Sequence, residues 1–264
     1  MYDRRTVLHL IDQWLDEDIG HGDLTTEIMI DADAEGAFAL NAREELTLAG
    51  LQVAADVFRR VDARIAFDAA TEDGARVAKG AVLARIAGPA RPILTAERVA
   101  LNILQRLSGI ATLTAAYVKE IEGAGATLVD TRKTTPGLRM LEKHAVACGG
   151  ARNHRLGLDG GIMLKDNHIA VAGGLKQAVA RARAHAPLLT KVEVECDRLD
   201  QVDEAVAAGA DVIMLDNMSN AQMREAIGRI KGRAVVECSG GVTLETIRGK
   251  AETGVDVISV GRIT

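Results

Sequence analysis

"KVEVECDRLDQVDEAVAAGADVIMLDN", residues 191–217, decides the fold of this 264-residue chain. It opens with an apolar run typical of a buried strand (191–196), continues with apolar residues at helical spacing (199–210) and returns to a second apolar run (211–217). A strand, a helix and a second strand of this length form a parallel pair joined by a right-handed crossover. The stretch therefore predicts a parallel sheet covered by helices.

The same pattern extends in both directions along the chain. Four more apolar runs bring the predicted strands to six, and amphipathic segments lie between them. Six units favour an incomplete (β/α) barrel, two units short of a closed one, with an open doubly wound sheet as the alternative. The further strands are expected at 127–130, 161–166, 234–241 and 256–261, and the further helices at 137–149, 174–186, 220–230 and 243–254.

The first third of the chain has a different pattern of apolar and polar residues. Residues 1–30 predict an amphipathic helix followed by a polar turn, "GHGDLTT". Residues 36–90 contain short apolar runs separated by glycines and charged turns, which is typical of an antiparallel sheet. A long helix follows over 95–125, ended by two glycines, and we expect the domain boundary near it. The expected domains are residues 1–108 and 109–264.

Composition excludes several classes of protein. The net charge is −5 and aromatic residues are only 2% of the chain, which disfavours a nucleic-acid-binding protein. No apolar run is long enough to span a membrane, and acids interrupt the N-terminal helix, so it is not a signal peptide. We therefore expect a cytoplasmic location. Three separated cysteines, without CxxC pairing, predict buried thiols in place of disulfides or a zinc site: Cys148, Cys196 and Cys238.

Charged and polar groups stand at the ends of the predicted strands, where active sites of parallel α/β folds are built. They are Asp130, Arg132, Lys133, Lys165, Asp166, Glu195, Asp216, Asn217, Glu237, Ser239 and Gly261. Between residues 132 and 165 there are seven Lys or Arg and two acids, an excess that suits carboxylate or phosphate oxygens. Glu195 and Asp216 suit sugar hydroxyls or Mg²⁺. The glycine loops that follow the last two strands, Ser239–Gly241 and Val260–Arg262, suit a phosphate. These ends together predict a site for an anionic small molecule and a phosphorylated sugar.

Neighbouring basic residues have different expected roles. His154 and Arg155 lie between two basic strand ends, and we expect them in the site. Arg139, Lys143 and Arg152 are expected to face solvent. Sequence alone leaves open whether Arg98, on the long helix, contributes to the site.

Seven motifs occur in an order that resembles quinolinate phosphoribosyltransferase. They are "ERVALNILQRLSGIAT", "DTRKTTPGLRMLEKHAVACGGARNHRLGL", "LKDNHI", "VEVE", "MLDN", "ECSGG" and "DVISVG", and the resemblance runs from residue 22 to the end. It implies an N-terminal α/β sandwich domain plus the incomplete barrel. The implied enzyme is a pentosyltransferase of NAD biosynthesis that converts quinolinate and phosphoribosyl pyrophosphate, with Mg²⁺, into nicotinate mononucleotide, pyrophosphate and CO₂.

The resemblance also implies roles for individual residues. Lys133, Glu195 and Asp216 would be catalytic, and the last two would also serve the metal, directly or through the substrate. No covalent cofactor or enzyme intermediate is required, so Cys148 and Ser239 are not expected to be nucleophiles. Arg98 would enter the partner's site in a homodimer. Substrate contacts are implied for Arg98, Thr131, Arg132, Lys133, His154, Arg155, Lys165, Glu195, Asp216, Ser239, Gly240, Gly241, Val260, Gly261 and Arg262.

Two departures and two alternatives accompany the resemblance. Family members usually continue beyond residue 264 into a strand with a histidine that contacts phosphate, and Arg262 stands where a small residue is usual. One alternative function is that of the molybdenum-transport-associated paralogue of the same fold. The other is a non-catalytic protein that binds anions or nucleic acid through the basic block.

Overall fold

A computed structural model describes residues 2–264 of the chain. The chain forms two compact units, and it passes between them more than once. The first unit contains the residues up to 115 together with 135–150, and the second contains 116–134 and 151–264. The division expected at residues 108 and 109 stays a prediction.

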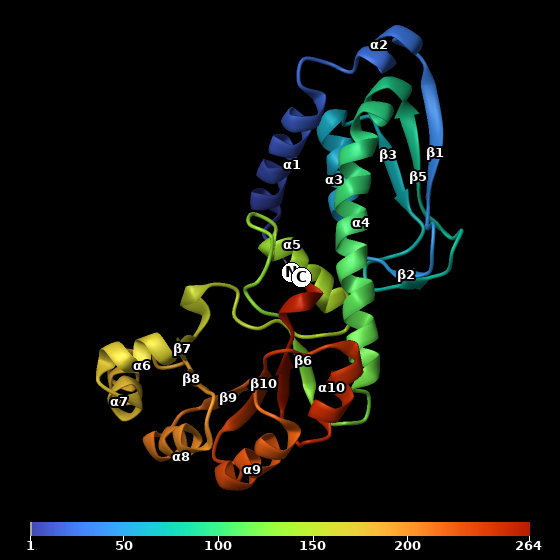
Figure 1. Cartoon of the computed structure of the whole chain (residues 1–264). Helices are drawn as coiled ribbons and strands as arrows, with labels where there is room; N and C mark the ends of the chain where they lie inside the picture. Colours follow the sequence, from blue (N-terminus) through green and yellow to red (C-terminus); the bar gives the residue numbers. More distant parts are fainter. Residues whose placement is uncertain (1) are drawn as a thin grey trace. The chain divides into compact units, whose positions relative to one another are not determined.

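The first unit has a small antiparallel sheet with helices beside it (Figure 1). Its three strands are ordered β1-β5-β3, and Phe38 on β1 is paired with Ile86 on β5. The amphipathic helix α3 buries Val53, Val57 and Phe58, so it supplies much of the core of this unit. The elements are α1 (Arg4–Ile19), α2 (Leu24–Met29), β1 (Glu35–Asn41), β2 (Leu46–Thr47), α3 (Leu51–Val61), β3 (Ala66–Ala69), β4 (Arg76–Val77), β5 (Val82–Pro89), α4 (Ala90–Glu120, whose last turn enters the second unit) and α5 (Arg139–Cys148).

Three expectations for the N-terminal third were incomplete. Helix α3 lies inside the stretch that was expected to be strands only. Helix α2 begins within the expected polar turn, where the Asp23 side chain accepts a hydrogen bond from the Thr26 N–H and caps it. Helix α4 begins at Ala90, five residues before its expected start.

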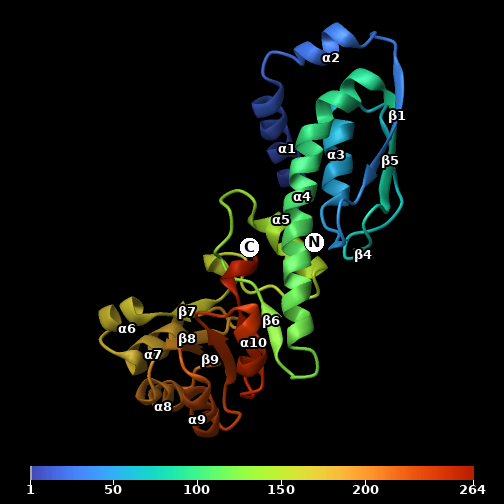
Figure 2. The ribbon, with the colours of Figure 1, turned by 45° about the vertical axis from the view of Figure 1, so that its right-hand side comes forward.

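The second unit is built on a parallel sheet of six strands, all at the predicted places. Their order is β6-β11-β10-β9-β8-β7, with α7 to α10 along the sheet (Figure 1, Figure 2). The elements are β6 (Thr127–Val129), β7 (Ile162–Leu164), α6 (Asp166–Ala172), α7 (Leu175–His185), β8 (Val192–Cys196), α8 (Leu199–Ala208), β9 (Val212–Asp216), α9 (Asn220–Ile230), β10 (Val235–Ser239), α10 (Leu244–Ala251) and β11 (Val257–Ser259), with short 3₁₀ turns η1 (Leu158–Gly160) and η2 (Gly261–Ile263).

The strand order identifies the second unit as an incomplete barrel. Each strand from β7 to β11 lies beside the next one in the sequence, and β11 returns to pair with β6, the first strand. Among the described residues, the two edges of the sheet are therefore the first and second strands of the series. A doubly wound sheet would instead reverse direction at a strand in its interior. The core side chains of the sheet, such as Val194, Ile213 and Ile258, are fully buried.

Helix α5 does not behave as an outer barrel helix. The segment 135–150 belongs to the first unit, where Glu142 is fully buried and accepts hydrogen bonds from the Arg106 guanidinium and the Thr135 N–H. Lys143 beside it is 1% exposed, so the expectation that this lysine faces solvent was wrong. A regular barrel would turn the face of this helix outwards, and here the helix packs within the other unit.

The remaining general expectations are partly met. The three cysteines are free thiols, but only Cys196 and Cys238 are fully buried, whereas Cys148 is half-buried beside His144. None of the helices described over residues 2–264 is long and apolar enough to cross a lipid bilayer. The cytoplasmic location stays a prediction.

Candidate active site

A cavity of about 610 Å³ opens at the carboxyl ends of the strands of the second unit. This volume is within the range of small-molecule sites in proteins. All of its lining residues belong to the second unit, residues 116–134 and 151–264. They are Thr131, Arg132, Lys133, His154, Arg155, Met163, Lys165, Glu195, Met214, Asp216, Asn217, Glu237, Ser239, Gly240, Gly241 and Ser259.

Strand alternation explains why these side chains meet. Residues two apart on a strand point to the same face of the sheet. On β9 this places Met214 and Asp216 on the inner face, and on β10 it places Glu237 and Ser239 there. The register then aligns Ser239 with Asp216 on the neighbouring strand. β9 and β10 thus each direct two side chains into the cavity, one at the end of the strand and one two residues earlier, deeper in the cavity.

Four basic side chains line the cavity: Arg132, Lys133, Arg155 and Lys165. The Arg155 guanidinium donates to the Gly161 carbonyl at 2.8 Å and to the Met163 sulfur at 3.6 Å, and neither acceptor carries a charge. Burial lowers the pKa of Arg155, and the neighbouring Arg132 lowers it further. Lys165 differs because its ammonium contacts the Glu195 carboxylate. Arg155 therefore keeps its charge available to an anion, whereas Lys165 shares its own with Glu195.

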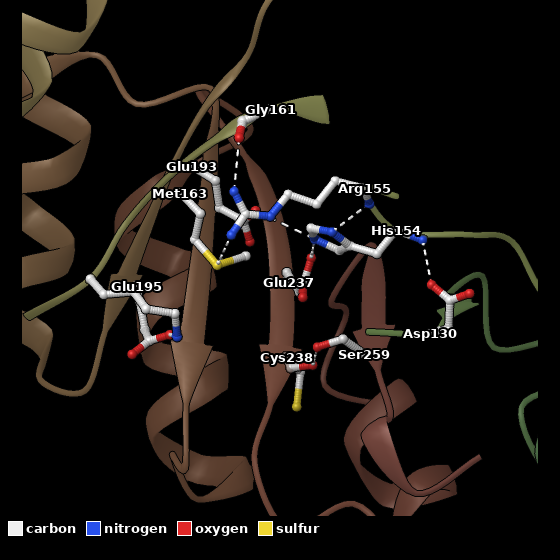
Figure 3. Close-up of polar contacts among 11 residues, drawn as sticks. Asp130, His154, Arg155, Gly161, Met163, Glu193, Glu195, Glu237, Cys238 and Ser259 are labelled. Carbon is white, nitrogen blue, oxygen red and sulfur yellow. Dashed lines mark hydrogen bonds and ion pairs between the residues drawn. The ribbon is translucent and has the colours of Figure 1, made fainter. Parts of the chain in front are cut away.

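His154 lies deeper, between two buried carboxylates (Figure 3). Its Nε2 is 3.4 Å from one oxygen of Glu193 and 3.4 Å from one oxygen of Glu237. These two carboxylates raise the pKa of His154 to about 9, against an opposing effect of burial. Burial also raises the pKa of Glu193, an effect that the contact with His154 reduces. The cavity floor is therefore a compact group of three titratable side chains.

Asp130 fixes the segment that carries His154 and Arg155. Its carboxylate is fully buried and accepts hydrogen bonds from the His154 N–H and from the Asn153 amide, each at 2.8 Å. The Arg155 N–H donates in turn to Nδ1 of His154 at 2.8 Å. Asp130, at the end of β6, thus holds the basic segment 153–155 through the His154 N–H (Figure 3) and the Asn153 side chain.

The loops after β9 and β10 approach each other closely at Gly240. A Cβ at this position would lie 2.2 Å from Oδ1 of Asn217 and 2.9 Å from its backbone nitrogen, and the φ of Gly240 is +88°. The Asn217 N–H donates to the Ser239 carbonyl at 3.1 Å, and its side-chain amide donates to Asp216 at 2.7 Å. A residue with a side chain does not fit here, and the glycine lets the loop carry its backbone next to Asp216.

Comparisons with known proteins agree with this geometry. The model of the quinolinate phosphoribosyl transferase C-terminal domain matches residues 110–264, and the model of the N-terminal domain of the same enzyme matches residues 23–108. The chain belongs to the quinolinate phosphoribosyltransferase family.

Individual relatives support this membership. The chain is similar to a probable carboxylating nicotinate-nucleotide pyrophosphorylase of Synechocystis (44% identity, covering 94% of this chain and 85% of that protein) and to one of Bacillus subtilis (43%, covering 97% and 88%). Among solved structures, NadC from Streptococcus pyogenes matches with a TM-score of 0.96 at 44% identity, covering 100% of this chain and 93% of that one.

Most of the residues expected in a quinolinate phosphoribosyltransferase site lie around the cavity. The structure brings together Thr131, Arg132, Lys133, His154, Arg155, Lys165, Glu195, Asp216, Ser239, Gly240 and Gly241. Their roles in binding and catalysis stay predictions.

Four expected site residues do not line the cavity. Val260 is buried, at 2% exposure, and Arg262 is exposed at the end of the chain. Gly261 lies just behind the wall, where a Cβ would come within 2.7 Å of the Lys133 side chain. Arg98 is exposed on α4 in the first unit. The last loop therefore supports Lys133, and Arg98 belongs to a different unit from the cavity.

One acidic residue, Glu193, was missing from the expected site, whereas Glu237 was expected with the polar groups at the strand ends. Both are inside strands, at 7% and 2% exposure. The available signal was alternation, since Glu193 precedes Glu195 by two residues on β8 and so points to the same face. Met163, Met214 and Ser259 also line the cavity without having been expected there, whereas Asn217 was expected at the end of its strand.

Proposed function

We propose that this chain transfers the phosphoribosyl group of phosphoribosyl pyrophosphate to quinolinate and releases pyrophosphate and CO₂, giving nicotinate mononucleotide. The observation that carries the proposal is one cavity in which four basic side chains stand beside two strand-end carboxylates and a glycine loop. Both substrates are strongly anionic, so such an excess of positive charge is what they require. The family match favours this activity over the paralogue and over nucleic-acid binding.

The two carboxylates of quinolinate would bind to the basic side chains. The Arg155 guanidinium donates to neutral acceptors, and Arg132 is close enough to lower the pKa of Arg155. Two neighbouring guanidinium groups would therefore be available to bind an anion. Guanidinium groups bind carboxylates through two parallel hydrogen bonds. We therefore assign quinolinate to the side of the cavity near Arg132, Lys133 and Arg155.

The phosphoribosyl group would occupy the opposite side. Glu195 and Asp216 end neighbouring strands, and Gly240 and Gly241 present backbone N–H groups without side chains. Backbone N–H groups in glycine turns are suited to phosphate oxygens. This arrangement would direct C1 of the ribose towards the quinolinate nitrogen.

The chemistry requires electrostatic stabilisation and no enzyme nucleophile. When pyrophosphate leaves, positive charge develops at C1 of the ribose, and the carboxylates of Glu195 and Asp216 would stabilise it. The ring nitrogen attacks C1 and becomes a pyridinium. The pyridinium then accepts the electron pair released when the adjacent carboxylate leaves as CO₂, and a proton takes its place on the ring carbon.

Mg²⁺ fits the donor set of this site. It prefers hard oxygen ligands and is commonly held by one or two carboxylates together with substrate phosphates. Glu195 and Asp216 are half-buried carboxylates that line the same cavity, so they would hold the ion. When bound, it would offset charge on the pyrophosphate.

A homodimer would complete the pocket with Arg98 of the partner. Arg98 is exposed on α4 and makes no ion pair with any residue from 2 to 264 in its own chain. An unpaired, exposed arginine on a regular helix is available to a second chain. Such a dimer would be closed and symmetric, with two equivalent pockets.

Turnover of quinolinate against nicotinate tests the function. The chain is incubated with phosphoribosyl pyrophosphate, Mg²⁺ and either quinolinate or nicotinate, and CO₂ and nicotinate mononucleotide are measured. We expect quinolinate to be far better, because nicotinate lacks one carboxylate and would leave basic side chains of the cavity unpaired. Equal turnover of the two would refute the assignment.

A further inference from the structure

The first unit contains a cluster of metal-ligating side chains that the proposed function does not use. Asp73 lies in the loop between β3 and β4, and His144 and Cys148 lie on α5. One ligand atom of each residue lies within 4.8 Å of the other two. All three residues belong to the first unit, whereas the residues that line the cavity belong to the second. The cluster is therefore a candidate site of its own.

Local structure explains why the three side chains converge. His144 and Cys148 are four residues apart, so they lie on the same face of α5, one turn from each other. Oδ1 of Asp73 accepts the N–H of Leu51 at 2.9 Å, at the first residue of α3. The other carboxylate oxygen, Oδ2, then lies 2.8 Å from Nε2 of His144. A hydrogen bond that orients a ligand in this way is a common feature of metal sites.

Both neighbours of the His144 ring approach the same nitrogen. Nε2 is 2.8 Å from Oδ2 of Asp73 and 3.5 Å from Sγ of Cys148. A nucleophilic Cys-His-Asp arrangement would need the thiol at one ring nitrogen and the carboxylate at the other. The cluster is therefore not built to activate the thiol for catalysis. It directs an oxygen, a nitrogen and a sulfur atom towards one point.

The distances are close to those around a tetrahedral zinc ion. With bonds of about 2.0–2.3 Å to oxygen, nitrogen and sulfur, neighbouring ligand atoms are roughly 3.3–3.6 Å apart. The distance between Nε2 of His144 and Sγ of Cys148 already has this value, at 3.5 Å. The distance between Nε2 and Oδ2 of Asp73 would have to widen by about 0.5 Å. A small rotation of the Asp73 carboxylate would supply this change.

The types of ligand favour zinc over the other common cations. Mg²⁺ and Ca²⁺ prefer oxygen ligands, whereas thiolate and imidazole suit Zn²⁺. A thiolate and a carboxylate together also balance the two positive charges of the ion. The side chains of Asp73 and His144 are 19% and 21% exposed, and Cys148 is half-buried. An ion can therefore enter from solvent and is then largely covered.

Without an ion, a proton occupies this point. The pKa of His144 is raised to about 9, first by its hydrogen bond to Asp73 and then by its contact with Cys148, so the ring is positively charged at neutral pH. The two groups that stabilise this charge would also stabilise a metal cation. Metal ligands bind without their protons, so the ion and the proton compete, and binding weakens as the pH falls.

We propose that Asp73, His144 and Cys148 bind a zinc ion, with a water molecule as the fourth ligand. This inference goes beyond the proposed function, because none of the three residues lines the cavity. The expectation that the cysteines form no zinc site followed from the absence of CxxC pairs, a pattern that does not cover a site with one cysteine. The ion would join the loop between β3 and β4 to α5 and so stabilise the first unit.

Cobalt binding to the reduced full chain tests the site. Co²⁺ substitutes for zinc, absorbs visible light strongly in tetrahedral coordination and shows a near-ultraviolet charge-transfer band when a thiolate is a ligand. The titration is done above neutral pH, with excess Mg²⁺ to occupy the carboxylates of the cavity. We expect one Co²⁺ per chain with the thiolate band, and loss of the band when Zn²⁺ is added. A wild-type chain that shows no thiolate band would overturn the proposal.

Variants identify the ligands. Cys148→Ala should abolish the thiolate band, and the control Cys238→Ala should keep it, because this thiol is fully buried in the second unit. Asp73→Asn and His144→Gln should each weaken Zn²⁺ binding more than about tenfold in competition with a chelating dye, since loss of a group that only orients a ligand already has an effect of this size. Wild-type affinity in both of these variants, or a band that survives in Cys148→Ala, would refute the site.

Alkylation of the wild-type chain gives a second measurement, which decides the question if Cys148→Ala does not fold. Cys196 and Cys238 are fully buried, so iodoacetamide should react with Cys148 in the folded chain. Zn²⁺ at ten times its dissociation constant should slow this reaction roughly tenfold, because the bound thiolate is no longer free to react, and Mg²⁺ should leave the rate unchanged. Equal rates of modification with and without Zn²⁺, located at Cys148 by mass spectrometry, would contradict the proposal.

Discussion

Replacing Gly240 by Ala tests whether the contact between the loops after β9 and β10 builds the site. A Cβ at this position would lie 2.2 Å from Oδ1 of Asn217 and 2.9 Å from its backbone nitrogen, so Asn217 has to move. Gly241→Ala is the matched control, because its φ is +59° and a Cβ there meets nothing within 4 Å. Both substitutions place alanine in the left-handed region, at a cost of about 1–2 kcal/mol. Only the first also displaces a neighbour.

The extra cost can be estimated from the bonds of Asn217. Moving it endangers the N–H bond to the Ser239 carbonyl and the side-chain bond to Asp216, each worth about 0.5–1.5 kcal/mol. Gly240→Ala should therefore be about 1–3 kcal/mol less stable than Gly241→Ala in urea unfolding. It should also raise the KM for phosphoribosyl pyrophosphate more than the control does, because Asp216 loses its orienting amide. Equal unfolding midpoints and equal KM values for the two variants would refute the reasoning.

Three further predictions concern the charged groups. Lys133→Ala removes a cation from the cavity wall and should lower kcat/KM roughly a hundredfold with little change in the free energy of unfolding; near-normal activity at low substrate would place this lysine outside the site. Arg98→Ala and Lys165→Ala should each be nearly inactive. When the two variants are refolded together, about half of the dimers are mixed and each mixed dimer holds one intact pocket, so about a quarter of wild-type activity should return. Heterodimers without activity would contradict the shared site. The pKa of His144 is raised to about 9, first by its hydrogen bond to Asp73 at 2.8 Å and then by its contact with Cys148. The stability that protonated His144 contributes is therefore complete below about pH 6.5 and is lost as the pH rises to about 9. His144→Gln should flatten the decline in Tm over this range, and an unchanged slope would refute the linkage.

The barrel strands could be predicted because burial on both faces gives each one a continuous apolar run. β9, with Ile213, Met214 and Leu215 all buried, is an example, and amphipathic helices separate the strands along the sequence. Helix α3 could not be separated from strands by the same reading. Its Val53, Val57 and Phe58 recur at helical spacing, but they stand among short runs of alternating character that do form strands.

The site could be predicted only as far as its upper layer. Lys165, Glu195 and Asp216 stand where strands end, and a parallel sheet brings such ends together. Glu193 and Glu237 are one layer deeper. Glu237 could be predicted as a group near a strand end, whereas Glu193 stands in a strand interior, which is normally apolar, so this acid signals no particular partner. Their common contact with His154 depends on the register of β8, β9 and β10, which the sequence does not contain in any local pattern.

Several elements of the chain are synthesised well before the elements that they pack against. The first unit lacks α5, and Arg106 lacks its partner Glu142, until residues 135–150 have left the ribosome. By then β6 has also been made, yet its neighbour in the sheet is β11, whose Val257 pairs with Thr127 at the far end of the chain. Contacts between such distant residues slow folding. During translation, β6 therefore lacks its strand partner β11 until the rest of the barrel has been produced, and an open strand edge of this kind promotes aggregation of the nascent chain.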